Sequence, residues 1–325
     1  MPRIAIRNTQ YGTRNLLPIP YPLSLLLVSF LTIFTAPKPF TNPHIATIQR
    51  NAIRSWLNIG EEVQVLLVGA EEGIAEVATQ LAVKHLPGVR CNQWGTPLVS
   101  SIFDLARQNS DAPLLAYLNA DIIIMPDFVA AVHQVASQTK EFLIIGRRWD
   151  LEVRRELDFA NGWPERLRAE VEARGRLHAP AGSDYFVFPR QLYTEMPDFA
   201  IGRAGWDNWA IFKARQSGWD VIDATPSLVV IHQDHDYSHL PGGRAHYDLE
   251  ESRLNTALAG GSARMYTVLD ANKVLLDGKI RSPAPSLLRA LRRAEILLTN
   301  GERQGLRYFL FRRVKRLRRR ITGTL

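Results

Sequence analysis

The amino-acid sequence predicts an α/β fold with one doubly wound, mostly parallel sheet and a basic helical tail. Three observations support this prediction. Segments with strand-like and helix-like patterns alternate along the chain, the strand-like segments are almost continuously apolar, and the positive charge gathers at the C-terminus. Strands of that kind are buried on both faces, as in parallel sheets covered by helices. With 325 residues, 46% of them hydrophobic, the chain can bury the core of one large domain.

The elements follow one another in a regular order. Asn42 and Pro43 form an N-cap and a first helical position, and apolar residues then recur at helical spacing. Thr96 and Pro97 are expected to open a later helix in the same way. Helices are expected at 42–59, 73–86, 97–110 and 127–139, and strands at 31–35, 63–69, 114–121, 141–148 and 227–232, with a second apolar stretch at 122–125.

The apolar run at 23–34 does not predict a membrane span. It holds twelve residues, whereas about 20 are needed to cross a bilayer. Prolines precede it and no clear cleavage site follows, so its end is expected to be the first core strand. We expect a loose leader at 1–28, one α/β domain at 29–280 and a basic amphipathic helical tail at 281–325.

The net charge of +8 is unevenly distributed. Residues 281–325 contain thirteen Lys or Arg and two acids, a charge of +11, so the other 280 residues sum to −3. A near-neutral body with a basic tail does not suggest a protein that binds nucleic acid over its whole surface. The single cysteine, Cys91, excludes an internal disulfide and fits a reducing, cytoplasmic compartment.

The ends of the predicted strands are expected to form the ligand site, because ligands of open α/β sheets bind outside the carboxyl ends of their strands. The chain contains neither a dinucleotide-binding glycine fingerprint nor a phosphate-binding P-loop. Residues 114–128, LLAYLNADIIIMPDF, place a carboxylate at the tip of a very apolar strand. The candidates at the strand tips are Thr35, Ala36, Pro37, Lys38, Gly69, Ala70, Glu71, Asn119, Ala120, Asp121, Gly146, Arg147 and Arg148.

The second half of the chain adds three motifs dense in aromatic, acidic and histidine residues: AGSDYF at 181–186, GWDNW at 205–209 and SLVVIH at 227–232. With these, the chain resembles nucleotide-sugar-dependent glycosyltransferases of the GT-A fold, in particular those similar to glycosyltransferase family 2. Asn119-Ala120-Asp121 resembles their D-x-D motif, with an amide in place of the first acid. GWDNW resembles the W-D-D-W segment of the N-acetylglucosaminyltransferases that build N-glycans.

The resemblance implies a role for several residues. Asp121 and His232 would bind Mn²⁺ or Mg²⁺, and Asp207 would be the catalytic base of an inverting transfer. Donor binding would involve Ala36, Pro37, Lys38, Gly69, Glu71, Asn119, Ala120, Asp184 and Tyr185. The acids at 121, 184 and 207 also have ordinary alternatives: Asp is common in turns and at helix N-termini, and the tryptophans around Asp207 can simply pack in the core.

HQDHDYSH, at 232–239, offers three histidines and two acids. These residues suggest either a zinc site or a loop over the donor that ends at Gly242-Gly243, in which one histidine binds the metal or the diphosphate. Surface histidines in a polar loop are the plain alternative.

The tail, over residues 285–320, mixes leucines with arginines, which is typical of a basic helix that docks on an anionic membrane surface. A helix packed on the body with a solvated arginine face is the alternative, and no nucleic-acid partner is expected. The protein would then be cytoplasmic and peripheral at the inner face of a membrane.

The function expected from these features is the transfer of a hexosyl or N-acetylhexosaminyl group from a nucleotide sugar to a hydroxyl of a glycan or lipid-linked glycan. Two alternatives stay open: a non-catalytic nucleotide- or glycan-binding protein, which Asn119 favours, and a sugar-phosphate nucleotidyltransferase. The latter would carry a glycine-rich loop after its first strand, where this chain has TAPKPF at 35–40.

Overall fold

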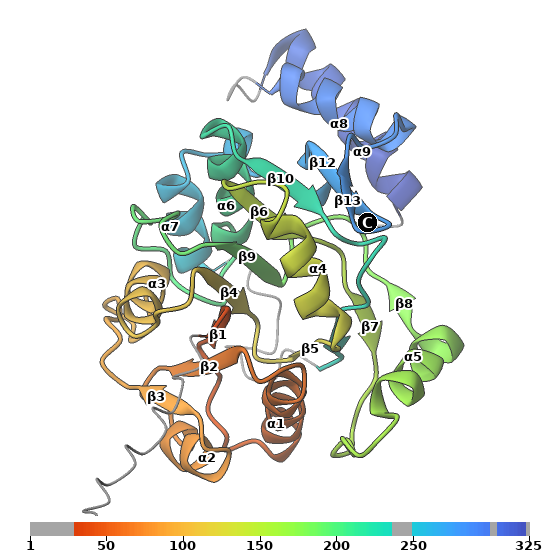
Figure 1. Cartoon of the computed structure of the whole chain (residues 1–325). Helices are drawn as coiled ribbons and strands as arrows, with labels where there is room; N and C mark the ends of the chain where they lie inside the picture. The colour runs from red at the N-terminus through yellow and green to blue at the C-terminus, as the bar shows by residue number, and fades with distance from the viewer. Residues whose placement is uncertain (1–28, 236–248, 300–303, 323–325) are drawn as a thin grey trace, which may run out of the picture.

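A nine-stranded sheet forms the centre of the molecule (Figure 1). The structure, a computed structural model, describes residues 29–235, 249–299 and 304–322, so the expected leader lies outside the described residues. The order across the sheet is β13-β12-β10-β6-β9-β4-β1-β2-β3. Its strands are β1 (Leu31–Thr35), β2 (Val63–Val68), β3 (Lys84–Leu86), β4 (Leu114–Leu118), β6 (Phe142–Ile145), β9 (Tyr185–Pro189), β10 (Asp220–Asp223), β12 (Lys273–Leu276) and β13 (Lys279–Arg281).

The strands of this sheet are mostly parallel. One parallel group runs β3-β2-β1-β4 and another runs β6-β10-β12. β9 joins the two groups and is antiparallel to both, and β13 is antiparallel to β12 at one edge. The predicted fold class is therefore confirmed.

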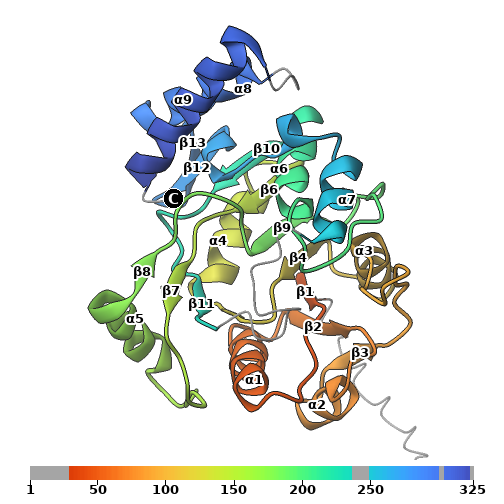
Figure 2. The ribbon, with the colours of Figure 1, turned by 180° about the vertical axis from the view of Figure 1, so that it is seen from behind.

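Helices cover both faces of the sheet (Figures 1 and 2). One apolar core contains Trp56 from α1, Val77 from α2 and Val132 from α4. The other contains Phe103 from α3 and Ile211 from α6. The sheet is thus doubly wound. The helices are α1 (Pro43–Leu57), α2 (Ile74–Gln80), α3 (Val99–Gln108), α4 (Asp127–Ala136) and α6 (Trp206–Gln216).

The predicted start of α1 is confirmed, because the Asn42 side chain accepts hydrogen bonds from the backbone N–H groups of His44 and Ile45. Two other helix predictions were wrong at their ends. The helix expected over 73–86 ends at Gln80, since Ala82 takes a left-handed conformation (φ 52°) and the chain then enters β3.

The helix expected to open at Thr96 and Pro97 begins at Val99 instead. β-bridges between Cys91 and Pro97 and between Leu98 and Ala200 hold the preceding residues extended. Pairing with distant parts of the chain thus overrides the local proline signal.

The strand expected to end at 119–121 is β4, which ends at Leu118. The apolar stretch after it contains β5 (Ile122–Ile123), which belongs to a second, four-stranded sheet with the order β5-β11-β7-β8. The strand expected at 227–232 is β11 (Ile231–Gln233), which begins four residues later than expected and ends one residue after His232. The other members are β7 (Trp149–Leu151) and β8 (Arg176–Leu177), beside which α5 (Trp163–Arg174) packs (Figure 2).

The C-terminal part contains α7 (Glu250–Leu258), the short helices η3 (Ser262–Arg264) and η4 (Val268–Asp270), and two long helices, α8 (Leu287–Leu298) and α9 (Gly305–Thr322). α8 and α9 lie side by side beyond the β12–β13 edge of the sheet (Figures 1 and 2). The expected tail is thus a pair of helices. Its division from the body at residue 281 stays a prediction, and β13 carries the sheet as far as Arg281.

Within the described part of the chain, every helix is too short or too polar to cross a membrane.

A buried group of ion pairs connects α8, α9 and the body. Arg292 pairs with Asp270 of η4 at 2.9 Å and with Glu295 at 3.3 Å. Glu295 also accepts from Arg318 of α9, with Nε–Oε2 at 2.7 Å. Some tail arginines are therefore structural, because Arg292 and Arg318 are buried in these pairs.

We predict that Glu295→Ala loosens the two tail helices, because Arg318 would lose its carboxylate partner while still buried. Removing one partner of a buried ion pair costs roughly 3–5 kcal/mol. Hydrogen exchange should rise across 287–322 and stay unchanged in the central sheet. Glu156→Ala, which removes an exposed pair with Arg54, is the matched control. Unchanged exchange in α9 would show that the Glu295 pairs do not hold the tail.

Candidate functional site

Three residues from two distant segments converge beside the end of β4: Asp121, His232 and His235. Asp121 lies in the connection between β4 and β5, His232 lies in β11, and His235 follows that strand. Asp121 Oδ2 is 3.1 Å from His235 Nε2 and 3.9 Å from His232 Nε2. One ligand atom from each residue lies within 4.8 Å of the others, so the three could hold a metal ion.

The second sheet explains why these residues meet. β5 and β11 are antiparallel, and their register puts His232 opposite Ile122. The buried Gln233 bonds the carbonyl of Asp121 twice, through its backbone N–H at 3.2 Å and through its side-chain amide at 3.1 Å. Its side chain also accepts a hydrogen bond from Asn51 of α1, which fixes β11 against that helix. The backbone of the site is therefore held by buried hydrogen bonds.

The environment of Asp121 favours its charged form. Burial alone would raise its pKa, but His232, His235 and Lys38 together hold the pKa of this carboxyl well below its usual range. Asp121 Oδ1 and His232 Nδ1 are buried and make no hydrogen bond. Enclosed lone pairs beside an ionised carboxylate suit a divalent cation. A mixed set of carboxylate oxygen and imidazole nitrogen fits Mn²⁺ better than Mg²⁺, which prefers oxygen ligands.

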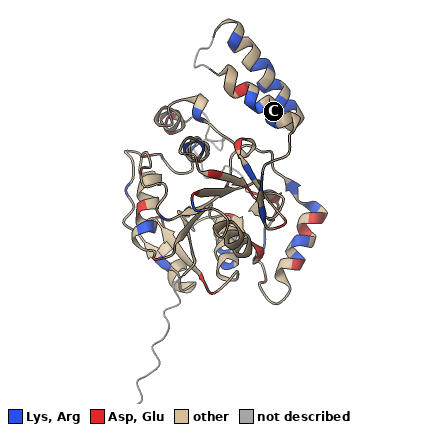
Figure 3. Ribbon diagram, turned by 45° about the horizontal axis from the view of Figure 1, so that its top comes forward, with Lys and Arg blue, Asp and Glu red and all other residues tan. Residues whose placement is uncertain are grey.

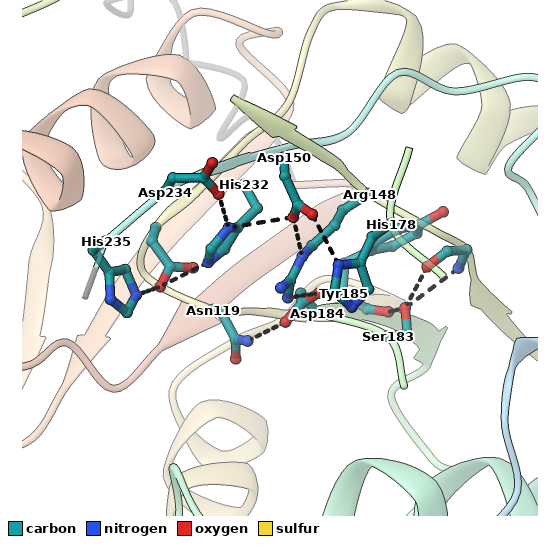
Figure 4. Close-up of polar contacts among 12 residues, drawn as sticks. Asn119, Arg148, Asp150, His178, Ser183, Asp184, Tyr185, His232, Asp234 and His235 are labelled. Carbon is teal, nitrogen blue, oxygen red and sulfur yellow. Dashed lines mark hydrogen bonds and ion pairs between the residues drawn. The ribbon is translucent and has the colours of Figure 1, made fainter. Parts of the chain in front are cut away.

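A second carboxylate, Asp150 of β7, supports His232 from behind. It is nearly fully buried, with Oδ1 3.6 Å from His232 Nδ1 and Oδ2 2.9 Å from His178 Nδ1. Arg148 Nε bonds Asp150 Oδ1 at 3.0 Å. Figure 4 shows Asp150 between the two histidines, with Asp234 on the far side of His232. Asp150, His232 and Asp234 form a second set that could hold a metal ion.

The sequence prediction missed Asp150 and His178, placed Arg148 at a strand tip without giving it a role, and did not choose His235 among the three histidines of its segment. Asp150 is separated from His232 by 82 positions, and only the parallel pairing of β7 with β11 brings them together. The one available signal was an acid between two apolar residues of a strand, in Trp149-Asp150-Leu151.

Asn119 and Asp184, both predicted to bind a donor, do meet. Asn119 Nδ2 donates to Asp184 Oδ1 at 2.7 Å, and Arg148 Nη1 bonds Asp184 Oδ2 at 2.5 Å (Figure 4). The amide that replaces the first acid of the D-x-D pattern is therefore connected to Asp184. Through Arg148, this pair continues into the carboxylate of Asp150 and so to His232.

Asp207 lies in the first turn of α6, after Gly205. Its pKa is raised to about 6: burial raises it most, nearby Asp184 adds to the rise, and backbone N–H groups of the first turn counteract it. Gly182 makes room for the carboxylate, since a Cβ at that position would lie 2.2 Å from Asp207 Oδ2. Trp206 and Trp209 are buried in the core, so packing is the role that the structure shows for them.

The tips of the first two strands differ in their relation to the site. Lys38 belongs to it, because its Nζ lies 3.3 Å from His235 Nε2 and Gln49 of α1 bonds its backbone N–H and carbonyl. Glu71 packs against Gly69, and burial raises the pKa of its carboxyl. Burial also raises the pKa of the Cys91 thiol, and the negative charge of Glu71 raises it further. Beside Lys38, Ala36 is half-buried and Pro37 is buried. Ala120, beside Asp121, is half-buried.

Tyr185, predicted to contact the donor, lies in the core. Its side chain is 0% exposed and packs edge-on against Phe128, and its hydroxyl lies against Gly146, where a Cβ would be 2.1 Å away. Packing is therefore the role that the structure shows for Tyr185, and its predicted contact with the donor stays a prediction. His239 and Gly242-Gly243 lie outside the described residues.

No known protein-family profile matches the chain, and no curated protein matches its sequence. Several solved structures are similar to it. A mannosyltransferase from Pyrobaculum calidifontis, in complex with GDP-Man and Mn²⁺, is 14% identical, with a TM-score of 0.42 over 89% of this chain and 69% of that one. Glucosyl-3-phosphoglycerate synthase from Mycobacterium tuberculosis, in complex with Mn²⁺, UDP and glucosyl-3-phosphoglycerate, is 16% identical, with a TM-score of 0.44 over 80% and 88%. A likeness this distant assigns no substrate.

Proposed function

We propose that the protein is a metal-dependent glycosyltransferase of the GT-A type, which moves a sugar from a nucleotide-sugar donor to a hydroxyl acceptor. One observation carries the proposal: Asp121, His232 and His235 converge at the end of β4, the end of the strand where α/β sheets bind ligands. Asp184 and Asp207 are near the same end of β4. Burial raises the pKa of Tyr117 in that strand, and the nearby charges of Asp121, Asp184 and Asp207 raise it further.

The donor half of the site would be built around that cluster. Asp121 and His232, with His235, would hold Mn²⁺ or Mg²⁺. When bound, such an ion supplies positive charge that stabilises the diphosphate as the bond to the sugar breaks. Asp150 would orient His232, because carboxylates behind metal-binding histidines fix their ring orientation. The ammonium of Lys38, beside His235, would add charge for the diphosphate.

The acceptor half would depend on Asp207. An attacking hydroxyl must lose a proton, and a carboxylate with a pKa near the working pH is suited to take it. Asp207 has a pKa raised to about 6. Direct attack by an acceptor deprotonated in this way inverts the anomeric carbon, so we propose an inverting transfer. Asn119 and Asp184 would contact the sugar between the two halves.

The raised pKa of Asp207 predicts a pH dependence. Below about pH 6 the carboxyl would be protonated in the folded protein and could not accept a proton. Turnover should therefore fall about tenfold per pH unit below that value and level off above it. A pH profile of kcat/KM over a range in which the protein stays folded measures this limb. A profile that is flat through pH 5 would contradict the assignment of Asp207 as the base.

We propose that the acceptor is a hydroxyl of a glycan or lipid-linked glycan, and that the protein works in the cytoplasm at the inner face of a membrane. The transferred group would be a hexosyl or N-acetylhexosaminyl unit. The basic tail helices support this location, since anionic lipids attract such segments. A lipid-linked acceptor would be reached from the same surface.

A non-catalytic role in nucleotide or glycan binding is the second candidate, and Asn119 favours it because an amide is a weaker ligand for a hard cation than a carboxylate. Release of nucleoside diphosphate from nucleotide sugars, with Mn²⁺ and with EDTA, separates the two. Saturable binding of a nucleotide sugar without release in the presence of any hydroxyl acceptor would favour the binding protein. Release of pyrophosphate from a nucleoside triphosphate and a sugar phosphate would indicate a nucleotidyltransferase.

A further inference from the structure

The outer side of α9 combines an exposed apolar stripe with a high positive charge. Leu306, Leu310, Leu317 and Ile321 are 74%, 42%, 49% and 46% exposed. Their spacing of four, seven and four positions puts them on one side of the helix. This is a different side from that of the buried Arg318, which faces Glu295 of α8. The stripe is therefore not what attaches α9 to the rest of the protein.

Cations border this stripe. The 18-residue helix contains eight Lys or Arg and no acid. Arg313, Arg316 and Arg320 are exposed and follow the stripe along one side at helical spacing. Figure 3 shows the concentration of blue on the tail helices compared with the mixed colours of the body. An exposed leucine row beside arginines matches the boundary of an anionic bilayer, where apolar side chains enter the acyl region and cations meet phosphates.

Other occupants fit this surface less well. A second copy of the chain would bring eight more cations against the first eight. Nucleic acid would make no use of an aliphatic stripe, and it prefers aromatic rings with open faces for base stacking. The rings of α9 already carry cations: Arg313 lies 4.7 Å from the centroid of Phe309, and Lys315 lies 5.3 Å from that of Phe311.

We propose that the outer face of α9, defined by Leu306, Leu310, Leu317, Ile321 and the flanking Arg313, Arg316 and Arg320, docks the protein on an anionic lipid bilayer. The helix would lie in the plane of the interface with its leucines below the headgroups. The buried pair of Glu295 with Arg318 connects α9 to α8, and the pair of Arg292 with Asp270 connects α8 to the body, so the whole protein would be held at the surface. This inference does not depend on the proposed transferase activity.

The test is sedimentation of the full chain with sucrose-loaded vesicles. Wild type should bind vesicles rich in phosphatidylglycerol and bind pure phosphatidylcholine vesicles weakly, with binding reduced by salt. Replacing Arg313, Arg316 and Arg320 with Gln should lower binding at least about tenfold. Replacing Leu306, Leu310 and Leu317 with Ser should lower it at least about tenfold as well. All six side chains are exposed, so the fold should be unaffected.

Matched variants on the body serve as controls. One control replaces three exposed cations of the body with Gln and so removes the same charge: Lys84, Lys140 and Arg154. The other replaces two exposed leucines of the body with Ser: Leu57 and Leu254. These should bind vesicles like wild type. The proposal is overturned if wild type ignores anionic vesicles, or if the body variants lose binding as the tail variants do. It is also overturned if the serine variant binds vesicles as wild type does. Loss of RNA binding in the arginine variant would then indicate a nucleic-acid partner, and a change in self-association alone would indicate a second copy of the chain.

Discussion

Asp207→Asn should abolish most sugar transfer while leaving the donor site intact. The substitution keeps the size and hydrogen-bonding reach of the side chain but removes the proton acceptor. Turnover at saturating donor should fall by roughly 10²–10⁴-fold, the usual contribution of a positioned base. The melting temperature should stay the same or rise, because burial disfavours the charged form of this carboxyl, as its pKa of about 6 indicates.

The alternative for Asp207 is a role in stabilising the first turn of α6. Asn is as good as Asp at helix N-termini, so that alternative predicts nearly unchanged turnover. Asp104→Asn, which changes an exposed acid of α3, controls for the loss of one charge. Activity of Asp207→Asn within a few-fold of wild type would exclude it as the base, and Asp184 or Asp234 would be the next candidates.

Asp121→Ala should remove the metal dependence of nucleotide binding. Asp121 is the carboxylate that His232 and His235 both face, and the variant leaves two imidazoles without it. The Kd of a nucleoside diphosphate in the presence of Mn²⁺ should rise about 100-fold or more, a loss at least as large as those from changes around a metal site. Isothermal titration with Mn²⁺ and with EDTA measures the effect.

The control for this variant is Asp158→Ala, which removes an acid whose side chain is 79% exposed. Asp121→Ala should lower the free energy of unfolding more than Asp158→Ala, because His232, His235 and Lys38 stabilise the ionised carboxylate. The variant should still fold, since Gln233 holds the backbone of Asp121 through its carbonyl. Unchanged Mn²⁺-dependent affinity in Asp121→Ala would show that the ion, if one binds, is held elsewhere, and the second set at Asp150, His232 and Asp234 would then be the place to examine.

The fold was predictable from local patterns where those patterns decide the structure. The capped start of α1 at Asn42 and the bounds of β1 depend on side chains within a few residues. The errors occurred where distant pairing decides. The helix expected to open at Thr96 and Pro97 begins at Val99, because Leu98 pairs with Ala200, and local patterns do not reveal a partner 102 positions away.

The site shows the same division. Asp121 could be noticed because a carboxylate at the tip of an apolar strand is unusual, and His232 because it ends an apolar run. Asp150 could not, since its position behind His232 depends on the second sheet. The burial of Tyr185 could not be predicted either, because it depends on the position of β9 between β4 and β6 with a core on each face. Roles for Asp121, His232 and Asp207 stay predictions that the two variants above test.

The release of nucleoside diphosphate from nucleotide sugars tests the central claim most directly. The wild-type chain is incubated with a panel of nucleotide sugars and hydroxyl acceptors in Mn²⁺, and then in EDTA. A metal-dependent glycosyltransferase should release the diphosphate from at least one donor in Mn²⁺, stop in EDTA and recover when Mn²⁺ is restored. The account is contradicted if no nucleotide sugar binds or is consumed in Mn²⁺, or if the release continues unchanged in EDTA and in Asp121→Ala.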